Sequence, residues 1–404
     1  MPGQIKSPVR TLGVLTGGGD VPGLNAAIKA LVYRAETLGI SVIGLRYGWR
    51  GITFLNRNRP REEQIFRADD PQTWDDHYLL PLNRQNTRTI DRQGGTILLS
   101  TRTNPARVRV SELPEHLKHR GEGRDAQEYL DLTDEVLANI EFLGLDGLVV
   151  IGGDDTLSYG AVLGAKGVPV WGIPKTMDND VPGTDYCIGF QTAINRASEF
   201  IGRLRSTLGS HSETALFRLF GRDAGFTALE TAIVTWADRL LIPEVPANID
   251  QLAELVASDR RNNPNHYSIV VLSEGANLGM PVPEVGPEDA YGHRKKANVA
   301  EFLAEQLSKR LPGVRFLPID LTYILRSGEP DVYDRHMAIY FANMAMSLVE
   351  QGIHGAMAGY REGKIIYTDL PGKDKPPRRV NPDDYHPTRY RPRFERISGP
   401  YMPL

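Results

Sequence analysis

The chain has 404 residues, of which 41% are hydrophobic and 24% charged, and its formal net charge is −3. This length allows two domains with cores of their own. The near-neutral charge gives no electrostatic reason to expect nucleic acid or an acidic membrane as a partner. The N-terminus is polar, no apolar run approaches the roughly 18 residues of a membrane span, and the single cysteine, Cys187, excludes an intrachain disulfide. We therefore expect a soluble cytoplasmic protein without nucleic-acid or membrane partners.

The first predicted strand covers residues 11–15 and runs into a glycine-rich loop at residues 16–25, followed by a helix. Such a loop lets backbone N–H groups approach phosphate oxygens, helped by the positive end of the helix dipole. No Lys-Ser or Lys-Thr pair closes the loop as in a Walker motif, and Pro22 interrupts a GxGxxG pattern. Taken alone, the loop suits a tight turn as well as phosphate binding.

Residues 56–93 are polar, with little periodicity, and predict an excursion from the sheet. Residues 94–102 are expected to form a further strand that ends in Arg102. The planar guanidinium of Arg102 suits a phosphate, although a solvated surface arginine is an equally good interpretation of this residue alone. A helix expected within residues 125–143 then leads to the central part of the chain.

Two strand-to-loop units, residues 148–156 and 168–180, form that central part. The first ends in Gly-Gly-Asp-Asp-Thr and the second in Pro-Lys-Thr-Met-Asp-Asn-Asp. Both sequences can form ordinary turns, but both follow buried-strand signals, which in a parallel sheet places them at the carboxyl ends of neighbouring strands. Several carboxylates would then face one crevice and repel one another. We therefore expect a hydrated Mg2+ ion among them.

The rest of the chain continues to alternate strands with helices, which predicts an α/β fold with parallel sheets. In chain order the expected elements are a helix at 190–204, strands at 215–220, 240–243 and 268–272, a helix at 294–311, a strand at 314–319 and the longest helix at about 332–351. Arg218 interrupts the otherwise apolar strand at 215–220. From residue 371 the chain holds eight of the 28 prolines, and its eight Lys and Arg outnumber four Asp and Glu. We expect this tail to lie over the domains of its own chain or against a neighbouring subunit.

These loops together suit phosphoryl transfer, which depends on positioning and charge neutralisation. Asp178 is placed to take the proton of an attacking hydroxyl, and Asp154 to hold the magnesium ion. Lys175 would meet the charge on the phosphoryl group in flight. The arginines and Tyr323 would hold an anionic acceptor such as a sugar phosphate.

Four motifs resemble, in the same order, the signature loops of the phosphofructokinase family: residues 17–25, 152–156, 174–180 and 221–222. With Glu274 and residues 323–326, the resemblance runs from about residue 9 to 360. It implies two three-layer α/β/α domains with the active-site cleft between them, and phosphoryl transfer to O1 of fructose 6-phosphate. The implied domains are residues 1–190 with about 328–360 for the donor, 191–327 for fructose 6-phosphate, and a Pro/Arg-rich extension at 361–404.

Two positions of this resemblance concern the phosphoryl donor. The residues that match Asp155 and Lys175 are glycines in ATP-using relatives, and aspartate and lysine in pyrophosphate-using relatives. An aspartate here fills the space that the α-phosphate of a nucleotide would enter, and opposes its charge at a cost of the order of several kcal/mol if desolvated. The resemblance therefore implies pyrophosphate as the donor and a readily reversible reaction.

The resemblance also implies the role of each site residue. Asp178 and Lys175 would be catalytic, and Asp154 would bind the metal. The remaining residues would bind the substrates: Gly18, Arg102 and Asp155, with Lys175, for pyrophosphate, and Thr176, Asp180, Arg222, Glu274, Tyr323 and Arg326 for fructose 6-phosphate. A homo-oligomer, either a dimer or a tetramer, is implied as well.

The sequence departs from the family pattern at three further positions, one of which is Met177 in place of the commoner isoleucine. Glu213 stands where ATP-using bacterial members carry an arginine that reaches a neighbour's sugar phosphate, and Phe220 replaces a usual methionine. Three alternatives stay open: ATP as the donor, sedoheptulose 7-phosphate as the acceptor, or a catalytically silent sugar-phosphate sensor. The presence of the base, the metal ligand and the lysine argues against the silent sensor.

Overall fold

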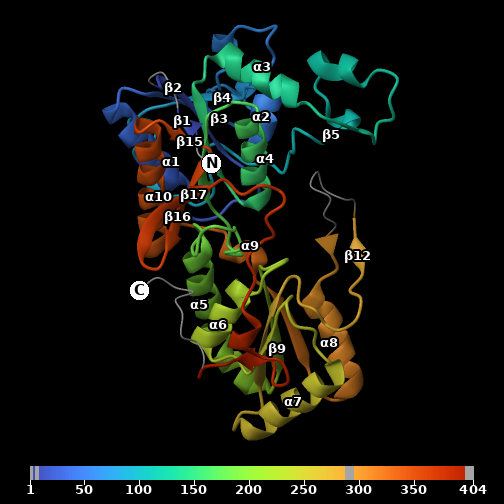
Figure 1. Cartoon of the computed structure of the whole chain (residues 1–404). Helices are drawn as coiled ribbons and strands as arrows, with labels where there is room; N and C mark the ends of the chain where they lie inside the picture. Colours follow the sequence, from blue (N-terminus) through green and yellow to red (C-terminus); the bar gives the residue numbers. More distant parts are fainter. Residues whose placement is uncertain (1–2, 5–8, 287–294, 396–404) are drawn as a thin grey trace.

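The computed structural model describes residues 3–4, 9–286 and 295–395, which form two α/β halves, one above the other in Figure 1. The first half is built on a seven-stranded sheet in the order β17-β16-β8-β7-β2-β3-β4. Its five inner strands are parallel, and the two edge strands, β4 and β17, pair antiparallel. The strands are β2 (Thr11–Thr16), β3 (Ser41–Leu45), β4 (Leu79–Leu82), β7 (Gly147–Gly152), β8 (Val170–Pro174), β16 (Ala356–Arg361) and β17 (Lys364–Asp369).

Both faces of this sheet are buried, as the apolar runs of its inner strands require. In β7, Val149 and Ile151 belong to one hydrophobic cluster, while Leu148 and Val150 belong to the cluster on the opposite face. Helices α1 (Leu24–Thr37) and α10 (Val332–Glu350) cover the first face. The second face is covered by α2 (Trp49–Thr53), α3 (Thr133–Leu143) and α4 (Asp154–Ala165).

The second half is a four-stranded, fully parallel sheet in the order β10-β11-β9-β14. Its strands are β9 (Thr214–Leu219), β10 (Arg239–Leu241), β11 (Ser268–Ser273) and β14 (Phe316–Asp320). Helices α5 (Phe190–His211) and α6 (Phe226–Thr235) lie on one side, and α7 (Ile249–Asn262) and α8 (Val299–Arg310) on the other (Figure 1). Helix α9 (Thr322–Leu325) lies between the halves. The α/β fold with two three-layer halves is thus confirmed.

The remaining elements are short. They comprise the strand pairs β1 (Gly3–Gln4) with β15 (Ile353–His354), β5 (Val108–Arg109) with β6 (Tyr129–Leu130), β12 (Glu284–Val285) with β13 (Lys295–Lys296), and β18 (Tyr385–His386) with β19 (Arg391–Pro392). Short 3₁₀ turns lie at Arg61–Gln64, Pro71–Thr73, Ile90–Arg92, Val110–Glu112, Glu115–Gly121 and Pro382–Asp384. Within the described residues, none of the helices has the length and apolar character needed to cross a bilayer.

The strand predicted at residues 94–102 is wrong. Leu99 has a positive φ of 56°, which a strand does not allow. The main chain of this segment is hydrogen-bonded to residues in two loops and not to a neighbouring strand: Tyr47 N donates to Leu98 O (2.7 Å), and Gly18 N donates to Thr101 O (3.1 Å). The apolar run is therefore a loop that packs beside the glycine-rich turn. Its Ser100 Oγ donates to Gly18 O at 2.5 Å, so the loop fixes the shape of that turn.

Several predicted boundaries also shift. The helix expected from residue 125 begins only at Thr133, and the helix at 190 continues to His211, so α5 and not α10 is the longest helix of the described residues. The helix predicted from residue 294 begins at Val299; residue 294 itself lies outside the described residues. Residues 361–369, assigned to the extension, include β17 of the first sheet. The domain limits inferred from the sequence remain predictions.

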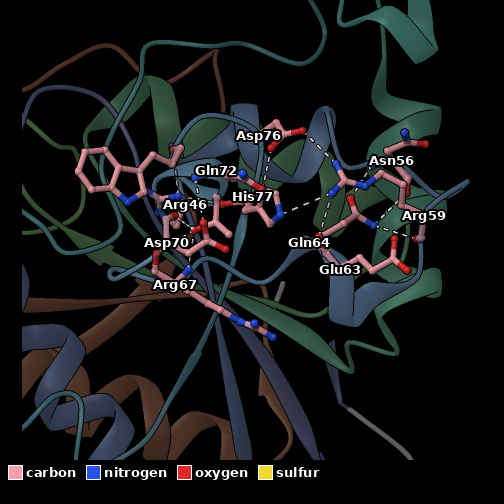
Figure 2. A network of polar contacts seen from close by, with 12 residues as sticks. Arg46, Asn56, Arg59, Glu63, Gln64, Arg67, Asp70, Gln72, Asp76 and His77 are labelled. Atoms are coloured by element: carbon pink, nitrogen blue, oxygen red, sulfur yellow. Dashed lines mark hydrogen bonds and ion pairs between the residues drawn. The ribbon is translucent and has the colours of Figure 1, made fainter.

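The polar segment at 56–93 leaves the sheet and returns to it as edge strand β4. Figure 2 shows the side-chain network that holds this excursion. Arg59 Nη1 lies 2.9 Å from Asp76 Oδ2, His77 Nδ1 lies 2.6 Å from Asp76 Oδ1, and Arg46 donates to His77 O at 2.9 Å. Since these groups bond mainly to one another, the network accounts for the order of a segment with little apolar content.

Candidate active site

A cavity of about 600 Å³ lies between the halves, and the loops that line it follow β2, β7 and β8 of the first sheet and β9, β11 and β14 of the second. The carboxyl ends of both parallel sheets therefore face the same space, where α/β folds bind ligands. All twelve residues selected from the sequence line this cavity: Gly18, Arg102, Asp154, Asp155, Lys175, Thr176, Asp178, Asp180, Arg222, Glu274, Tyr323 and Arg326. Their individual roles remain predictions.

At one end of the cavity, Lys175 reaches from β8 to the glycine-rich turn after β2. Its Nζ donates to Gly19 O at 2.8 Å, and a Cβ on Gly18 would come within 3.0 Å of it. Burial lowers the pKa of Lys175 to about 8, and the nearby charge of Arg326 adds to this effect. A buried ammonium group whose only partner in the described contacts is a carbonyl is well suited to meet an anion.

Asp154 and Asp155 begin helix α4, directly after β7 and Gly153. Burial raises the pKa of Asp154, and the charge of Asp155 raises it further. The helix N-terminus favours negative charge here, but two adjacent carboxylates oppose each other. A cation close to Asp154 would relieve this repulsion.

Asp178 lies in the loop after β8 and faces the second half. Its Oδ2 accepts a hydrogen bond from Arg222 N at 3.2 Å, and its own N–H donates to Thr176 Oγ1 at 3.1 Å. Burial raises the pKa of Asp178 to about 6, with a further contribution from the charge of Glu274. Such a carboxylate is close to the basicity that proton abstraction at neutral pH requires.

Asp180 is 7% exposed, and burial holds its pKa well above the ordinary value, assisted by the charges of Asp178 and Asp154. Arg222 counterbalances these acids from the second half. Burial disfavours its cation, but the hydrogen bond and charge of Asp223, and the charges of Asp154 and Asp155, outweigh that effect and raise the pKa of Arg222. Arg222 thus brings a positive charge from the second half to the acidic groups of the first.

Arg218, which the sequence analysis did not select, lines the cavity from β9 of the second sheet. Its side chain is only 8% exposed, and it pairs with Asp320 Oδ2 at 2.5 Å and Glu274 Oε1 at 3.5 Å. Both Arg218 and Asp320 line the cavity. The sequence did carry a signal for Arg218, because it is the one charged residue within a predicted apolar strand. A charged side chain in a buried strand needs a partner, which makes such a residue a candidate for a site.

Arg326 and Tyr323 complete the mouth of the cavity. Tyr323 is 75% exposed, and Arg326 Cζ lies 5.5 Å from its ring centroid and 4.5 Å from that of Phe220. Phe220, the departure from the family pattern, therefore supports the arginine through a cation–π contact. Arg326 also lies 3.6 Å from Asp20 Oδ1 of the glycine-rich turn, so it reaches from the second half to the first.

Comparisons with known proteins show the family and the fold. The family model described as Phosphofructokinase matches residues 11–349. A pyrophosphate--fructose 6-phosphate 1-phosphotransferase of Dictyoglomus thermophilum is 33% identical over 377 residues, which covers 93% of this chain and 96% of the relative. An ATP-dependent 6-phosphofructokinase 3 of Streptomyces coelicolor is 34% identical over 362 residues, covering 89% and 93%.

Among solved structures, the pyrophosphate-dependent phosphofructokinase of Marinobacter aquaeolei superimposes with a TM-score of 0.71 at 16% identity. The match covers 96% of this chain and 89% of that one. At this level of identity the superposition establishes the shared fold.

Proposed function

The chain belongs to the phosphofructokinase family, and on that premise we propose that it transfers a phosphoryl group from pyrophosphate to O1 of fructose 6-phosphate. The reaction would be reversible, with fructose 1,6-bisphosphate and phosphate as products. The name of the Dictyoglomus thermophilum relative supports this substrate pair, whereas the name of the Streptomyces coelicolor relative supports ATP as the donor. The donor therefore has to be argued from the residues of the cavity.

The observation that carries the proposal is that Lys175 and Asp155 both line the same cavity. Lys175 places a compact positive charge against Gly18 and Gly19, where a small phosphate anion fits. Asp155 lines the same cavity, and its carboxylate would oppose the additional α-phosphate of a nucleotide. Pyrophosphate has no third phosphate group to meet this carboxylate.

The donor end also fits a divalent cation, and we propose Mg2+. Asp154, its pKa raised by burial and by Asp155, is a carboxylate that a cation would stabilise. Among the described residues, no three or more His, Cys, Asp or Glu side chains converge as a complete metal site. This suits Mg2+, which proteins often hold through one or two carboxylates while phosphate oxygens and water complete the shell. When bound, the ion would neutralise charge on the phosphate oxygens.

The chemistry needs little else from the protein. Asp178 would take the proton from the acceptor hydroxyl as that oxygen bonds to phosphorus, while the bond to the bridging oxygen of pyrophosphate breaks and phosphate leaves. Lys175 would stabilise the charge on the transferred group. Arg222, Glu274 and Arg326 would hold the sugar phosphate against the second sheet.

The deciding experiment measures phosphorylation of fructose 6-phosphate with Mg2+ and either pyrophosphate or ATP. Wild type is expected to use pyrophosphate, and Asp155→Gly to gain weak turnover with ATP because the opposing carboxylate is gone. Asp125→Gly, at an exposed position outside the cavity, serves as the matched control. Efficient use of ATP by wild type would refute the donor assignment.

The proposal also covers a second acceptor, the oligomeric state and the cellular location. Sedoheptulose 7-phosphate as an acceptor shares the terminal phosphate with fructose 6-phosphate and should be assayed beside it. A homo-oligomer is supported by family membership, and light scattering of the purified protein tests it. A cytoplasmic location is supported by the single cysteine, which lies buried and unpaired in the fold.

A further inference from the structure

The C-terminal segment crosses from the first half of the molecule to the second (red in Figure 1). At its start, Leu370 packs so closely on Gly172 that a Cβ there would lie 2.7 Å from Leu370 Cδ2. At its far end, Tyr385 Oη donates to Leu240 O at 2.6 Å, and Leu240 N donates to Tyr390 O at 2.7 Å. Both ends are thus anchored, and residues 371–384 bridge the two halves.

Between these anchors, Arg378 binds the rear of the loop that carries Asp178. Its N–H donates to Asp180 O at 2.7 Å, and its Nη1 donates to Asn179 O at 3.2 Å and Thr184 O at 2.8 Å. Its Nη2 lies 3.7 Å from Asp185 Oδ1, and its guanidinium carbon lies 5.1 Å from the centroid of the Phe226 ring. One residue of the tail therefore satisfies three main-chain carbonyls of this loop.

The loop needs such support because its backbone is unusual. Asn179, between the two aspartates, is fully buried and has a φ of 55°, a left-handed conformation that persists in a non-glycine residue only when its surroundings enforce it. The side chain of Asn179 braces one side, since it donates to Asp185 O and accepts from Cys187 N. Arg378 braces the carbonyl side.

Two residues further on, the same segment bonds to Glu244, in the loop that follows β10 of the second half. Val380 N donates to Glu244 Oε1 at 2.9 Å, and this oxygen also accepts from Gly225 N at 2.9 Å. Gly225 ends the turn that begins with Arg222, whose N–H donates to Asp178. The segment thus bonds directly to the loop that carries Asp178, and Glu244 connects it to the loop that carries Arg222.

We propose that Arg378 is a positioning residue for phosphoryl transfer, and that residues 371–384 form a strap that fixes the Asp178 loop against the Arg222 loop. This inference rests on the proposed function for its effect on turnover, but its structural part stands on the contacts alone. Arg378 lies outside the cavity lining, so it acts through the loop and not on the substrates. Its loss should therefore lower the rate of the chemical step more than the affinity for either substrate.

The test compares full-length wild type, Arg378→Met, Arg378→Lys and Arg379→Met. Methionine keeps an apolar stem over Phe226 and the main-chain hydrogen bond to Asp180 O, but its side chain donates nothing. Arg379 is an exposed neighbour of the same charge. With the donor that wild type uses, Arg378→Met should lower kcat by about tenfold to a hundredfold, while both KM values stay within about threefold. Arg378→Lys should recover part of the loss, and Arg379→Met should match wild type.

A second readout, amide hydrogen exchange of residues 176–186, does not depend on turnover. Exchange should be faster in Arg378→Met and unchanged in Arg379→Met. If wild type turns over with neither pyrophosphate nor ATP, the proposed function fails, and exchange alone decides whether the strap exists. An unchanged kcat in an active Arg378→Met, a rise confined to KM, or unchanged exchange would overturn the inference. If Arg378→Met does not fold, Arg378→Lys carries the same comparison.

Discussion

At the scale of single residues, burial acts in opposite directions on the two groups proposed to do the chemistry. It raises the pKa of Asp178 to about 6 and lowers the pKa of Lys175 to about 8. Between these values the carboxylate is free to accept a proton and the lysine is still positively charged. The same burial that makes each charge costly therefore places both in their active forms near neutral pH.

The pH dependence of kcat/KM should consequently be bell-shaped. Activity should fall as the pH drops through about 6, because Asp178 becomes protonated, and fall again as the pH rises through about 8, because Lys175 loses its charge. Initial rates at limiting fructose 6-phosphate across pH 5 to 9, at roughly constant ionic strength, test this. The pH profile of Lys175→Met should lose its alkaline limb and keep its acid limb. This variant therefore distinguishes the titration of the lysine from that of the substrate phosphates. A wild-type rate that rises steadily towards pH 5 would contradict the assignment of Asp178.

Arg218 leads to a second prediction at this scale. Arg218→Met would leave Glu274 and Asp320 without their shared cation, and the free carboxylates would repel each other beside the acceptor. We expect the KM for fructose 6-phosphate to rise about tenfold with a smaller change in kcat. The free energy of unfolding should fall by about 2 kcal/mol, less than for a fully buried ion pair, because the carboxylate side chains are 28% and 37% exposed. Steady-state kinetics and urea unfolding measure both, and Arg218→Lys is the matched variant. An unchanged KM would mean that Arg218 does not hold the acceptor end.

At the scale of elements, the sequence predicted β7 and β8 and the loops after them because continuous apolar runs bounded by glycine and aspartate are typical of buried parallel strands. Residues 94–102 also hold a short apolar run after glycines but form a loop, because the positive φ of Leu99 and hydrogen bonds to the residues that follow β2 and β3 determine its path. These are tertiary contacts, which cannot be predicted from the local sequence pattern. Arg378 was unrecognisable for the same reason, because its partners lie almost 200 positions earlier in the chain.

The N-termini of α5 and α10 are joined by one carboxylate, Asp334, where the chain passes between the halves. Asp334 is fully buried, and its two oxygens accept from Tyr186 Oη (2.7 Å), Gly189 N (2.6 Å), Thr192 N (2.8 Å) and Thr192 Oγ1 (2.5 Å). Four donors from residues 186–192, at and just before the start of α5, thus converge on the first turn of α10. These hydrogen bonds hold the beginning of α10 against the beginning of α5.

Replacing Asp334 by asparagine should destabilise the protein strongly. Each carboxylate oxygen accepts from two donors, whereas an asparagine side chain has one accepting oxygen and one NH2 group. The two donors at one of these positions would therefore face the NH2 group of asparagine. We expect the free energy of unfolding to fall by about 2–4 kcal/mol, the cost of leaving buried donors unsatisfied. Urea unfolding measures the change, and Glu329→Gln, an exposed acid close by in the sequence, is the control. If both variants unfold at the same urea concentration as wild type, the junction does not depend on this carboxylate.

At the scale of the whole molecule, the cavity exists only because two separate sheets present their carboxyl ends to each other. One hydrophobic cluster runs from α1 and α10 into the second half and includes Tyr385 and Tyr390 of the tail. The tail was expected to lie over its own domains or against a neighbouring subunit, and its Tyr385 and Tyr390 belong to the core of the second half. The prolines and arginines of the tail predicted a segment on the surface, whereas its two buried tyrosines attach it to the second half.

This attachment predicts that the tail unfolds together with the second half. Tyr385 is fully buried, so Tyr385→Ala should lower the free energy of unfolding by about 3–5 kcal/mol, the usual cost of removing a large core side chain. Tyr385→Phe keeps the ring and loses only the hydrogen bond to Leu240 O, so it should cost about 1 kcal/mol. Urea unfolding followed by tryptophan fluorescence measures both, because Trp236 lies in the second half and stacks on Phe394 of the tail with ring centroids 4.9 Å apart. If Tyr385→Ala released the tail in an early, separate transition while the rest unfolded as in wild type, the tail would be an appendage. A single transition shifted to lower urea would mean that the tail belongs to the same cooperative unit as the second sheet, because the loss of one tail residue would then destabilise the whole of that unit.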